Sequence, residues 1–484
     1  MRSGPTFKVL GIILTLFSFT MLPPIFVSWL YAEHNQDPFV IAFFLTLVTG
    51  VLLYMPAKRT KRELRPKDGF IIVVLIWLTL ALFGATPYIF SEGLHLSFMQ
   101  ALFESMSGYS TTGATVITHL DQLPRSILYY RQQSQFFGGM GIIVLVIAVL
   151  PLIGVGGMQL YRAEANGPWK ENKLTPRIME TAKVLWIIYI FLTLACLVSY
   201  KLAGMTWFDS VCYAFSTIGT GGFAPHDASI AYYGTPNVYM VCMVFMIASA
   251  TSFALHFVSI KRMSIKNYWQ DSEFKSYIYF IGAMGVLVSL TLIGSGYYSH
   301  TNEALWQGFF QVVSFGTNTG FTSTSEYSNW PLFIPILLAI IGLIGGCAGS
   351  TSGGLKIIRA VLVRKQAVRE MRKLIHPNGI FPIKLGAKVM SESVVNSVWG
   401  FIAGYFLVFI VMWLLLMATG VDQITAFSAV AACISNVGPG IGGVSVNYAS
   451  LPDSAQALLC ATMLIGRLEV FTVLVLFMPD FWKH

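Results

Sequence analysis

The chain has 484 residues, of which 55% are hydrophobic and only 11% are charged, and its mean hydropathy is +0.67. Soluble globular proteins carry about 25% charged residues, so the composition excludes an ordinary soluble domain and indicates an integral membrane protein. The net charge of +9 does not indicate a nucleic-acid ligand, because the basic residues gather in loops between apolar runs. Six cysteines without a CxxC pair are typical of buried free thiols.

Apolar stretches long enough to span a membrane follow one another along the chain. A spanning helix needs about 20 apolar residues, and about ten stretches approach that length. They are residues 9–30, 39–54, 69–90, 135–152, 184–202, 238–260, 277–294, 332–358, 395–417 and 457–478. The first stretch exceeds the roughly 7–15 residues of a signal-peptide core, so we expect it to be retained in the protein.

The charges predict which loops face the cytoplasm. Basic residues cluster at positions 58–67, 162–183, 261–275 and 356–388. Because cytoplasmic loops are rich in Lys and Arg, these loops and both chain ends are predicted to be cytoplasmic. The opposite side is expected to carry mainly acidic residues, with Arg125 and Arg131 as cations beyond the membrane edge. Four loop histidines are expected to be solvated, namely His119, His226, His300 and His376.

Four half-apolar segments are too short to cross a membrane and predict re-entrant half-helices. They are residues 96–107, 207–215, 303–313 and 423–433. Each runs into a small, polar loop, and these loops read YSTTGAT (109–115), IGTGGFA (218–224), GTNTGFT (316–322) and SNVGPGI (435–441). Aligned on one glycine each, the loops contain TTG, TGG, NTG and NVG, so the same interruption occurs four times.

The aligned glycines recur at intervals of about 100 residues, which is typical of an internal repeat. The sequence therefore predicts an all-α membrane protein in which a two-helix leader precedes four pseudo-symmetric repeats of helix, pore half-helix and helix around a central pore. The expected units are residues 1–67 for the leader and 68–178, 179–272, 273–388 and 389–484 for the repeats.

The glycine loops have a composition that suits a dehydrated cation. Irregular backbone at membrane depth occurs only where protein buries it or where it lines a water-filled path. Glycine permits positive φ, so carbonyl groups can turn toward a common axis, and rings of carbonyls replace the hydration shell of K⁺ in selectivity filters. The candidate filter residues are Thr111, Thr112, Gly113, Thr220, Gly221, Gly222, Asn318, Thr319, Gly320, Asn436, Val437 and Gly438. Ordinary turns would explain one such loop but not four.

A second glycine-rich run, IGGCAGSTSGGLK (344–356), should break the helix predicted at 332–358. It lacks the GK[ST] ending of a phosphate-binding loop, and close helix packing through small residues stays an alternative. Arg467 lies deep in the last predicted span, where a charge costs at least about 2.5–3.5 kcal/mol and indicates a functional residue. We expect it to face the central cavity, with a structural ion pair as the alternative. Glu469 lies on a different helix face and is a poor partner.

The repeated pore unit, with one filter glycine in each of the TTG, TGG, NTG and NVG loops, resembles the superfamily of bacterial Trk and Ktr and plant HKT potassium transporters. The resemblance covers essentially the whole chain, and the leader resembles Trk rather than the shorter Ktr subunits. In that superfamily a first-loop serine accompanies sodium transport, so Gly113 favours K⁺. The resemblance also implies an intramembrane gating loop beneath the filter, with the gate residues Gly345, Gly346, Gly349, Ser350, Thr351, Gly353, Gly354 and Arg467.

The expected function is potassium uptake across the inner membrane through a channel-like pore, and not catalysis. The resemblance further implies a homodimer and a cytosolic, nucleotide-binding regulatory ring of the TrkA type that docks on the basic loops. This chain has no Rossmann fingerprint, so we expect K⁺, and Rb⁺ in its place, as its ligand and no nucleotide. An H⁺- or Na⁺-coupled potassium symporter is the alternative. Such symporters usually carry mid-membrane carboxylates, and Glu469 is the one candidate in the predicted spans.

Overall fold

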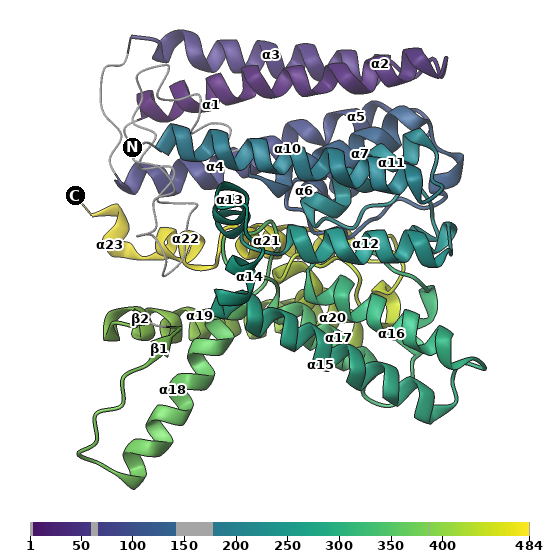
Figure 1. Cartoon of the computed structure of the whole chain (residues 1–484). Coiled ribbons are helices and arrows are strands. Elements are labelled where there is room, and N and C mark those ends of the chain that lie inside the picture. Colours follow the sequence, from purple (N-terminus) through teal and green to yellow (C-terminus); the bar gives the residue numbers. More distant parts are fainter. Residues whose placement is uncertain (1–2, 60–65, 142–177, 387, 484) are drawn as a thin grey trace.

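The computed structural model describes residues 3–59, 66–141, 178–386 and 388–483, and the regular secondary structure of these residues is almost entirely helical (Figure 1). The first part contains α1 (Ser3–Ser18), η1 (Phe19–Met21), α2 (Leu22–Leu30), α3 (Asp37–Ala57), α4 (Pro66–Gly84), α5 (Thr86–Phe90), α6 (Phe98–Tyr109), η2 (Leu120–Gln122) and α7 (Arg125–Gly139). The middle part contains α10 (Ile178–Leu202), α11 (Trp207–Gly219), η4 (Ser229–Tyr232), α12 (Pro236–Ser249), α13 (Phe253–Lys261), α14 (Lys266–Gln270), α15 (Ser272–Ser295) and α16 (Thr301–Gly316).

The last part begins with η5 (Ser325–Asn329), α17 (Ile334–Ile344) and α18 (Ile357–Ile375). A small antiparallel hairpin follows, β1 (Lys384–Leu385) with β2 (Lys388–Val389). The chain ends with α19 (Glu392–Ala418), α20 (Gln423–Ile434), η6 (Gly442–Val444), α21 (Asp453–Arg467), α22 (Phe471–Leu474), η7 (Val475–Phe477) and α23 (Pro479–Trp482). In Figure 1 the start of α1 and α23 lie on the same side of the bundle, and α18 leaves the bundle diagonally.

Six helices in the described residues are long and apolar enough to cross a membrane, or eight if two bent helix pairs each count as one span. The prediction of a helical membrane protein is therefore confirmed, and up to eight of the ten predicted spans are found among the described residues. Two of the predicted spans account for the difference. The stretch 135–152 lies mostly outside the described residues, and its helix α7 begins earlier, at Arg125. The stretch 332–358 is interrupted between α17 and α18.

Two other predicted spans, 238–260 and 457–478, are sharply bent rather than straight. The axes of α12 and α13 meet at 94°, and those of α21 and α22–η7 meet at 107°. At the second bend Glu469 and Val470 have φ values of +53° and +21°, which a continuing right-handed helix does not allow. Periodicity of apolar residues cannot reveal such a bend, because both halves remain apolar.

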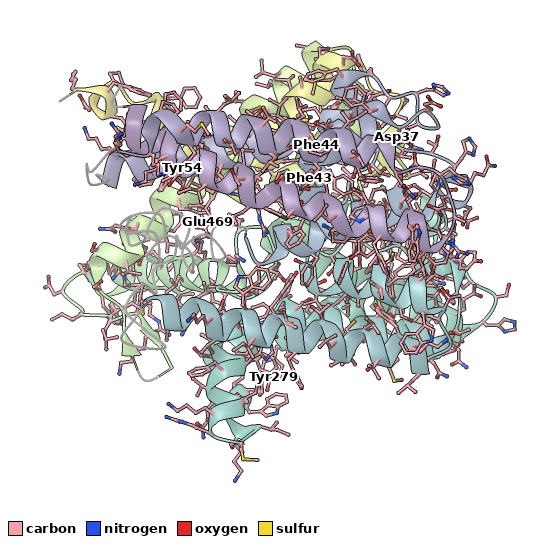
Figure 2. The ribbon with its side chains drawn as sticks, turned by 90° about the horizontal axis from the view of Figure 1, so that it is seen from above. Asp37, Phe43, Phe44, Tyr54, Tyr279 and Glu469 are labelled. Carbon is pink, nitrogen blue, oxygen red and sulfur yellow. The ribbon has the colours of Figure 1, made fainter. Side chains whose placement is uncertain are left out.

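The leader lies at one face of the molecule, where α1 packs along α3 (Figures 1 and 2). Two glycines allow this close approach. A Cβ on Gly11 would lie 2.6 Å from the Tyr54 nitrogen, and one on Gly50 would lie 2.7 Å from the Thr15 nitrogen. Side chains such as Phe44 are exposed on the other face of α3, as expected for a lipid-facing surface.

The half-helices predicted from sequence are α6, α11, α16 and α20, each within a few residues of the expected bounds. Three of them begin at a side-chain cap, because Ser97, Thr206 and Asp422 accept a hydrogen bond from the backbone N–H three residues on. Such caps satisfy a helix's unpaired first-turn N–H groups. The four half-helices are largely buried toward their C-terminal ends, so the glycine loops that follow them lie in the interior of the bundle.

Candidate functional site

The loops that follow the half-helices share one backbone conformation. For convenience they are numbered loop 1 (109–115), loop 2 (218–224), loop 3 (316–322) and loop 4 (435–441). Their aligned residues Gly113, Gly222, Gly320 and Gly438 have φ values of +82°, +79°, +82° and +93°. The residues two positions earlier are also left-handed, with φ of +54° at Thr111, +51° at Thr220, +57° at Asn318 and +54° at Asn436. Two left-handed residues in this spacing turn each chain sharply at the end of its half-helix.

The same hydrogen bond closes each turn. The N–H of the residue before the aligned glycine donates to a carbonyl in the last turn of the half-helix. The bonds are Thr112 to Ser107 at 2.9 Å, Gly221 to Ser216 at 2.9 Å, Thr319 to Ser314 at 3.0 Å and Val437 to Ala432 at 2.9 Å. This bond uses a carbonyl that the helix end would otherwise leave unpaired, so the turn and the half-helix support each other.

The loops lie against one another in a closed ring. A Cβ on Gly113 would collide with the carbonyl oxygen of Gly221 in loop 2. The remaining collisions follow the same order around the ring, with Gly222 meeting Thr319 O, Gly320 meeting Val437 O, and Gly438 meeting Thr112 O. Because the last contact returns to loop 1, the four loops form a closed cycle of contacts, and a side chain at any of the four glycines would force the neighbouring loop to shift.

Side chains hold some of the carbonyl groups at this level. The Gln135 side chain donates from Nε2 to Gly221 O at 2.7 Å and accepts from the Phe223 N–H at 3.0 Å. The Tyr448 hydroxyl donates to Gly438 O at 2.7 Å. Side chains from α7 and from the segment after η6 therefore fix the direction of these two carbonyl groups.

The second glycine-rich run breaks its helix as predicted, because α17 ends at Ile344 and α18 begins at Ile357. We call residues 345–356 the break segment. Its path needs left-handed backbone at Gly345, Gly349 and Gly354, with φ of +75°, +73° and +73°. The candidate gate residues Gly346, Ser350 and Gly353 lie on the same segment.

The break segment packs against the C-terminal ends of the half-helices. The Thr351 hydroxyl donates to Ile218 O at the end of α11 at 3.1 Å. The Ser352 hydroxyl donates to Asn318 Oδ1 of loop 3 at 3.0 Å, and a Cβ on Gly353 would collide with Ser435 O of loop 4. The segment therefore lies directly beneath loops 2, 3 and 4.

Arg467 joins the break segment to loop 1. Its Nη1 donates to Thr111 Oγ1 at 3.2 Å and to Thr351 O at 3.1 Å, and its Nη2 donates to the carbonyls of Gly138 and of Gly139, the latter at 3.2 Å. Arg467 therefore lies beside the glycine-rich run. Glu469 pairs instead with Arg359 of α18, at 2.5 Å.

Two site residues escaped the sequence interpretation. Glu104 of α6 is fully buried and Arg131 is 1% exposed, and they form an ion pair of 2.8 Å behind loop 1. Arg131, which was expected beyond the membrane edge, is therefore buried within the protein. A carboxylate within the half-apolar segment 96–107 was the available signal, because a charge in such a setting requires a partner.

The prediction of a solvated His226 is wrong. Its Nδ1 lies 2.5 Å from Asp121 Oδ1, its Nε2 lies 3.4 Å from Asp209 Oδ1, and its ring stacks on Tyr232 with centroids 3.6 Å apart. Burial alone would lower the pKa of His226, but hydrogen bonds to Asp209 and Asp121 raise it above the usual 6.5. Burial opposes ionisation of Asp121 and Asp209, but their hydrogen bonds to His226 lower the pKa of both carboxyls.

The apolar spans, the buried half-helices and the ring of glycine loops define a multi-pass membrane protein of the transport class. A family model described as a cation transport protein, TrkH, matches residues 35–484. The chain therefore belongs to the TrkH family of cation transport proteins.

Relatives resemble the chain over nearly its whole length. The Trk system potassium uptake protein TrkH of Salmonella typhimurium is 48% identical over 477 residues, which is 99% of each chain. The protein named TrkG from Escherichia coli K12 is 39% identical and covers 98% of this chain and 97% of its own. The crystal structure of the potassium transporter TrkH from Vibrio parahaemolyticus superimposes with a TM-score of 0.91 at 44% identity and covers 100% of both chains.

Proposed function

We propose that this chain takes up K⁺ across the inner membrane through a channel-like pore. The observation that carries the proposal is the closed ring of glycine loops, because four left-handed turns with carbonyl groups at each junction can replace the water around a dehydrated cation. The relatives named as potassium uptake proteins support the choice of K⁺.

In this proposal loops 1 to 4 form the selectivity filter, and the repeats 68–178, 179–272, 273–388 and 389–484 surround the pore with pseudo-fourfold symmetry. The half-helices α6, α11, α16 and α20 direct their partly negative C-terminal ends toward the centre, which favours a cation there. The glycine at position 113, rather than serine, favours K⁺ over Na⁺. Rb⁺, which is close to K⁺ in size, would use the same path.

The break segment and Arg467 act as the gate in this proposal. The segment lies across the C-terminal ends of the half-helices, where a cation would leave the filter. The guanidinium of Arg467 adds a positive charge at that level and bonds to Thr351 O. A cation meets both a steric and an electrostatic barrier there, which displacement of the segment would remove.

Assembly and orientation complete the proposal. The basic loops and both chain ends would face the cytoplasm, two copies of the chain would form a homodimer with one pore each, and a cytosolic TrkA-type ring would dock on the basic side. Regulating nucleotides would bind to that ring. Mixing tagged and untagged chains, followed by affinity purification, tests the dimer directly.

A potassium symporter driven by H⁺ or Na⁺ is less well supported. Proton relays need carboxylates that change protonation during transport. Glu104 and Glu469 are instead each held in an ion pair with an arginine, at 2.8 Å and 2.5 Å, so each carboxylate already has a fixed partner.

Uptake of radioactive rubidium into liposomes tests the proposal. Vesicles that contain the purified chain should accumulate rubidium down its gradient, K⁺ should compete, and Na⁺ should compete weakly. Uptake without an imposed H⁺ or Na⁺ gradient is the expected result. Vesicles that take up no rubidium would overturn the function, and strict dependence on a second ion gradient would favour the symporter.

A further inference from the structure

The buried ion pair between Glu104 and Arg131 connects the outer ends of loops 1 and 2. Glu104 Oε2 accepts from the Val116 N–H at 2.9 Å, and its Oε1 accepts from Arg131 Nε at 2.8 Å. The Thr115 hydroxyl donates to the same carboxylate at 2.9 Å. Glu104 therefore holds the two residues that follow loop 1's turn.

Arg131 extends this network to loop 2. Its Nη1 donates to Ala224 O at 3.1 Å, and its Nη2 donates to Thr115 Oγ1 at 3.1 Å. The guanidinium carbon also lies 4.3 Å from the centre of the Phe223 ring. One side chain thus bonds to backbone or hydroxyl groups on both sides of the junction at which Gly113 meets Gly221.

Loops 1, 3 and 4 share one backbone hydrogen bond, and loop 1 has the ion pair in addition. The residue three positions after the aligned glycine donates its N–H to a side chain of the half-helix in loops 1, 3 and 4. The bonds are Val116 to Glu104 at 2.9 Å, Ser323 to Gln311 at 3.3 Å and Ile441 to Ser428 at 2.9 Å. In loop 2 that position is Pro225, which has no N–H to satisfy.

The general requirement is therefore an acceptor for one backbone N–H, and a neutral side chain meets it in loops 3 and 4. Gln311 occupies the position in its half-helix that Glu104 occupies in α6. A charged acceptor is needed in loop 1 only because Arg131 is buried beside it. A buried arginine without its carboxylate would leave an uncompensated positive charge, which is strongly unfavourable and would repel a cation in the pore.

We propose that Glu104 and Arg131 are a positioning pair that fixes loop 1 against loop 2 and thereby sets the discrimination between K⁺ and Na⁺. The inference rests on the proposed function of the loops as a filter. The pair does not contact the ion. It acts by holding the carbonyls of the junction at the spacing that suits the larger cation, while Glu104 cancels the charge of Arg131.

Two variants separate the positioning of the loops from the neutralisation of the Arg131 charge. E104Q keeps an acceptor for the Val116 N–H, as Gln311 does in loop 3, but leaves Arg131 without a counter-charge. The double variant E104Q/R131M also removes that charge, together with the bonds to Ala224 and Thr115. The control is E392Q, which alters the exposed Glu392 partner of Arg369 near the start of α19, where the two side chains lie 2.8 Å apart.

The experiment measures rubidium uptake into liposomes, with competition by K⁺ and by Na⁺, for each folded variant. E104Q should lower the uptake rate and also lower the preference for K⁺ over Na⁺ by about fivefold or more, the effect of about 1 kcal/mol. E104Q/R131M should recover much of the uptake rate, because no charge is left unpaired, while the preference stays low. E392Q should match the wild-type protein in both readouts.

The outcomes distinguish this inference from the function on which it rests. If the wild-type protein takes up K⁺ selectively and both variants keep its K⁺ preference, the positioning role is wrong and the filter assignment survives. A wild-type protein that takes up no rubidium overturns both. Should E104Q fail to fold, the double variant alone decides, since a reduced preference supports the inference and an unchanged preference refutes it. Elution as a single species by size exclusion establishes folding beforehand.

Discussion

The junction between loops 1 and 2 and the junction between loops 3 and 4 have the same backbone contact but opposite surroundings. Behind the first junction, α7 presents Gln132 and Gln135 as well as Arg131, and Gln132 accepts from the Ser216 hydroxyl at 2.9 Å. Behind the second, the apolar helix α17 packs on Val437, and a Cβ on Gly342 would lie 3.1 Å from the Val437 Cγ2 atom. The ring therefore depends on backbone geometry, and either polar bonds or apolar packing can support it.

The largest expected effect comes from changing the backbone contact itself at both junctions. In Gly113→Ser and Gly320→Ser the new side chain would collide with the carbonyls of Gly221 and Val437, at a φ of +82° in each case. Strain of about 1–3 kcal/mol corresponds to roughly 5–150-fold, and we expect the preference for K⁺ over Na⁺ to fall by that factor in both variants. Competition of Na⁺ with rubidium uptake measures it. A loss in only one variant would mean that the junctions are not equivalent.

Arg467→Ala tests the polar side of the comparison at the level of the break segment. The variant removes donors to Thr111, Thr351, Gly138 and Gly139 and a positive charge from the proposed ion path. Bonds to charged groups contribute about 1.5–3 kcal/mol each, so we expect basal rubidium uptake to rise about tenfold or more in the absence of any partner. A folded variant whose uptake falls would contradict the gating role.

Ser352→Ala tests the side of loops 3 and 4, where a single neutral bond links the break segment to loop 3. The Asn318 amide donates to Gly342 O and Ser435 O at 2.8 Å each, and its oxygen accepts from Ser352. The same hydroxyl also accepts from the Gly346 N–H at 2.8 Å, a bond that lies within the break segment. Loss of the bond that links the segment to loop 3 costs about 1 kcal/mol, so we expect basal uptake to rise by about fivefold at most. The matched control is Ser397→Ala, whose hydroxyl bonds only within α19, to Ser393 O at 2.8 Å. An effect as large as that of Arg467→Ala would remove the contrast between the two sides.

The smallest effect is expected at the outer edge of the first junction, in His226→Gln. A raised histidine pKa stabilises the fold below the usual value of 6.5 and stops doing so as the pH rises through the raised pKa. The pKa values of Asp121 and Asp209 are lowered from 3.8, so their contribution to the stability of the fold is present at every pH above 3.8 and does not change between pH 5 and 9. The difference in melting temperature between wild type and variant, about 1–3 °C, should thus be largest near pH 5–6 and shrink toward pH 9. A difference independent of pH would show that His226 acts by packing alone.

The parts of this protein that depend on local sequence could be predicted, and those that depend on pairing across helices could not. The half-helix α20, for example, was expected at 423–433 and is found at Gln423–Ile434, because composition and length fix such an element locally. The partners of Glu104 and His226 come from other segments of the chain, and no periodicity links them. The bends at 250–252 and 468–470 were missed for a similar reason, since distant groups hold them. At the first bend, the Cys347 N–H donates to Ala250 O at 2.8 Å and the Phe253 N–H to Gly349 O at 3.0 Å.

The closed ring of glycine contacts is assembled from one polypeptide, and this has a genetic consequence. In an assembly of four identical subunits, any mutation alters every wall at once. Here a single codon change alters one of the four loops and leaves the other three unchanged. Each loop is therefore free to acquire its own neighbours, as Arg131 beside loops 1 and 2 and the apolar helix α17 beside loop 4 already illustrate.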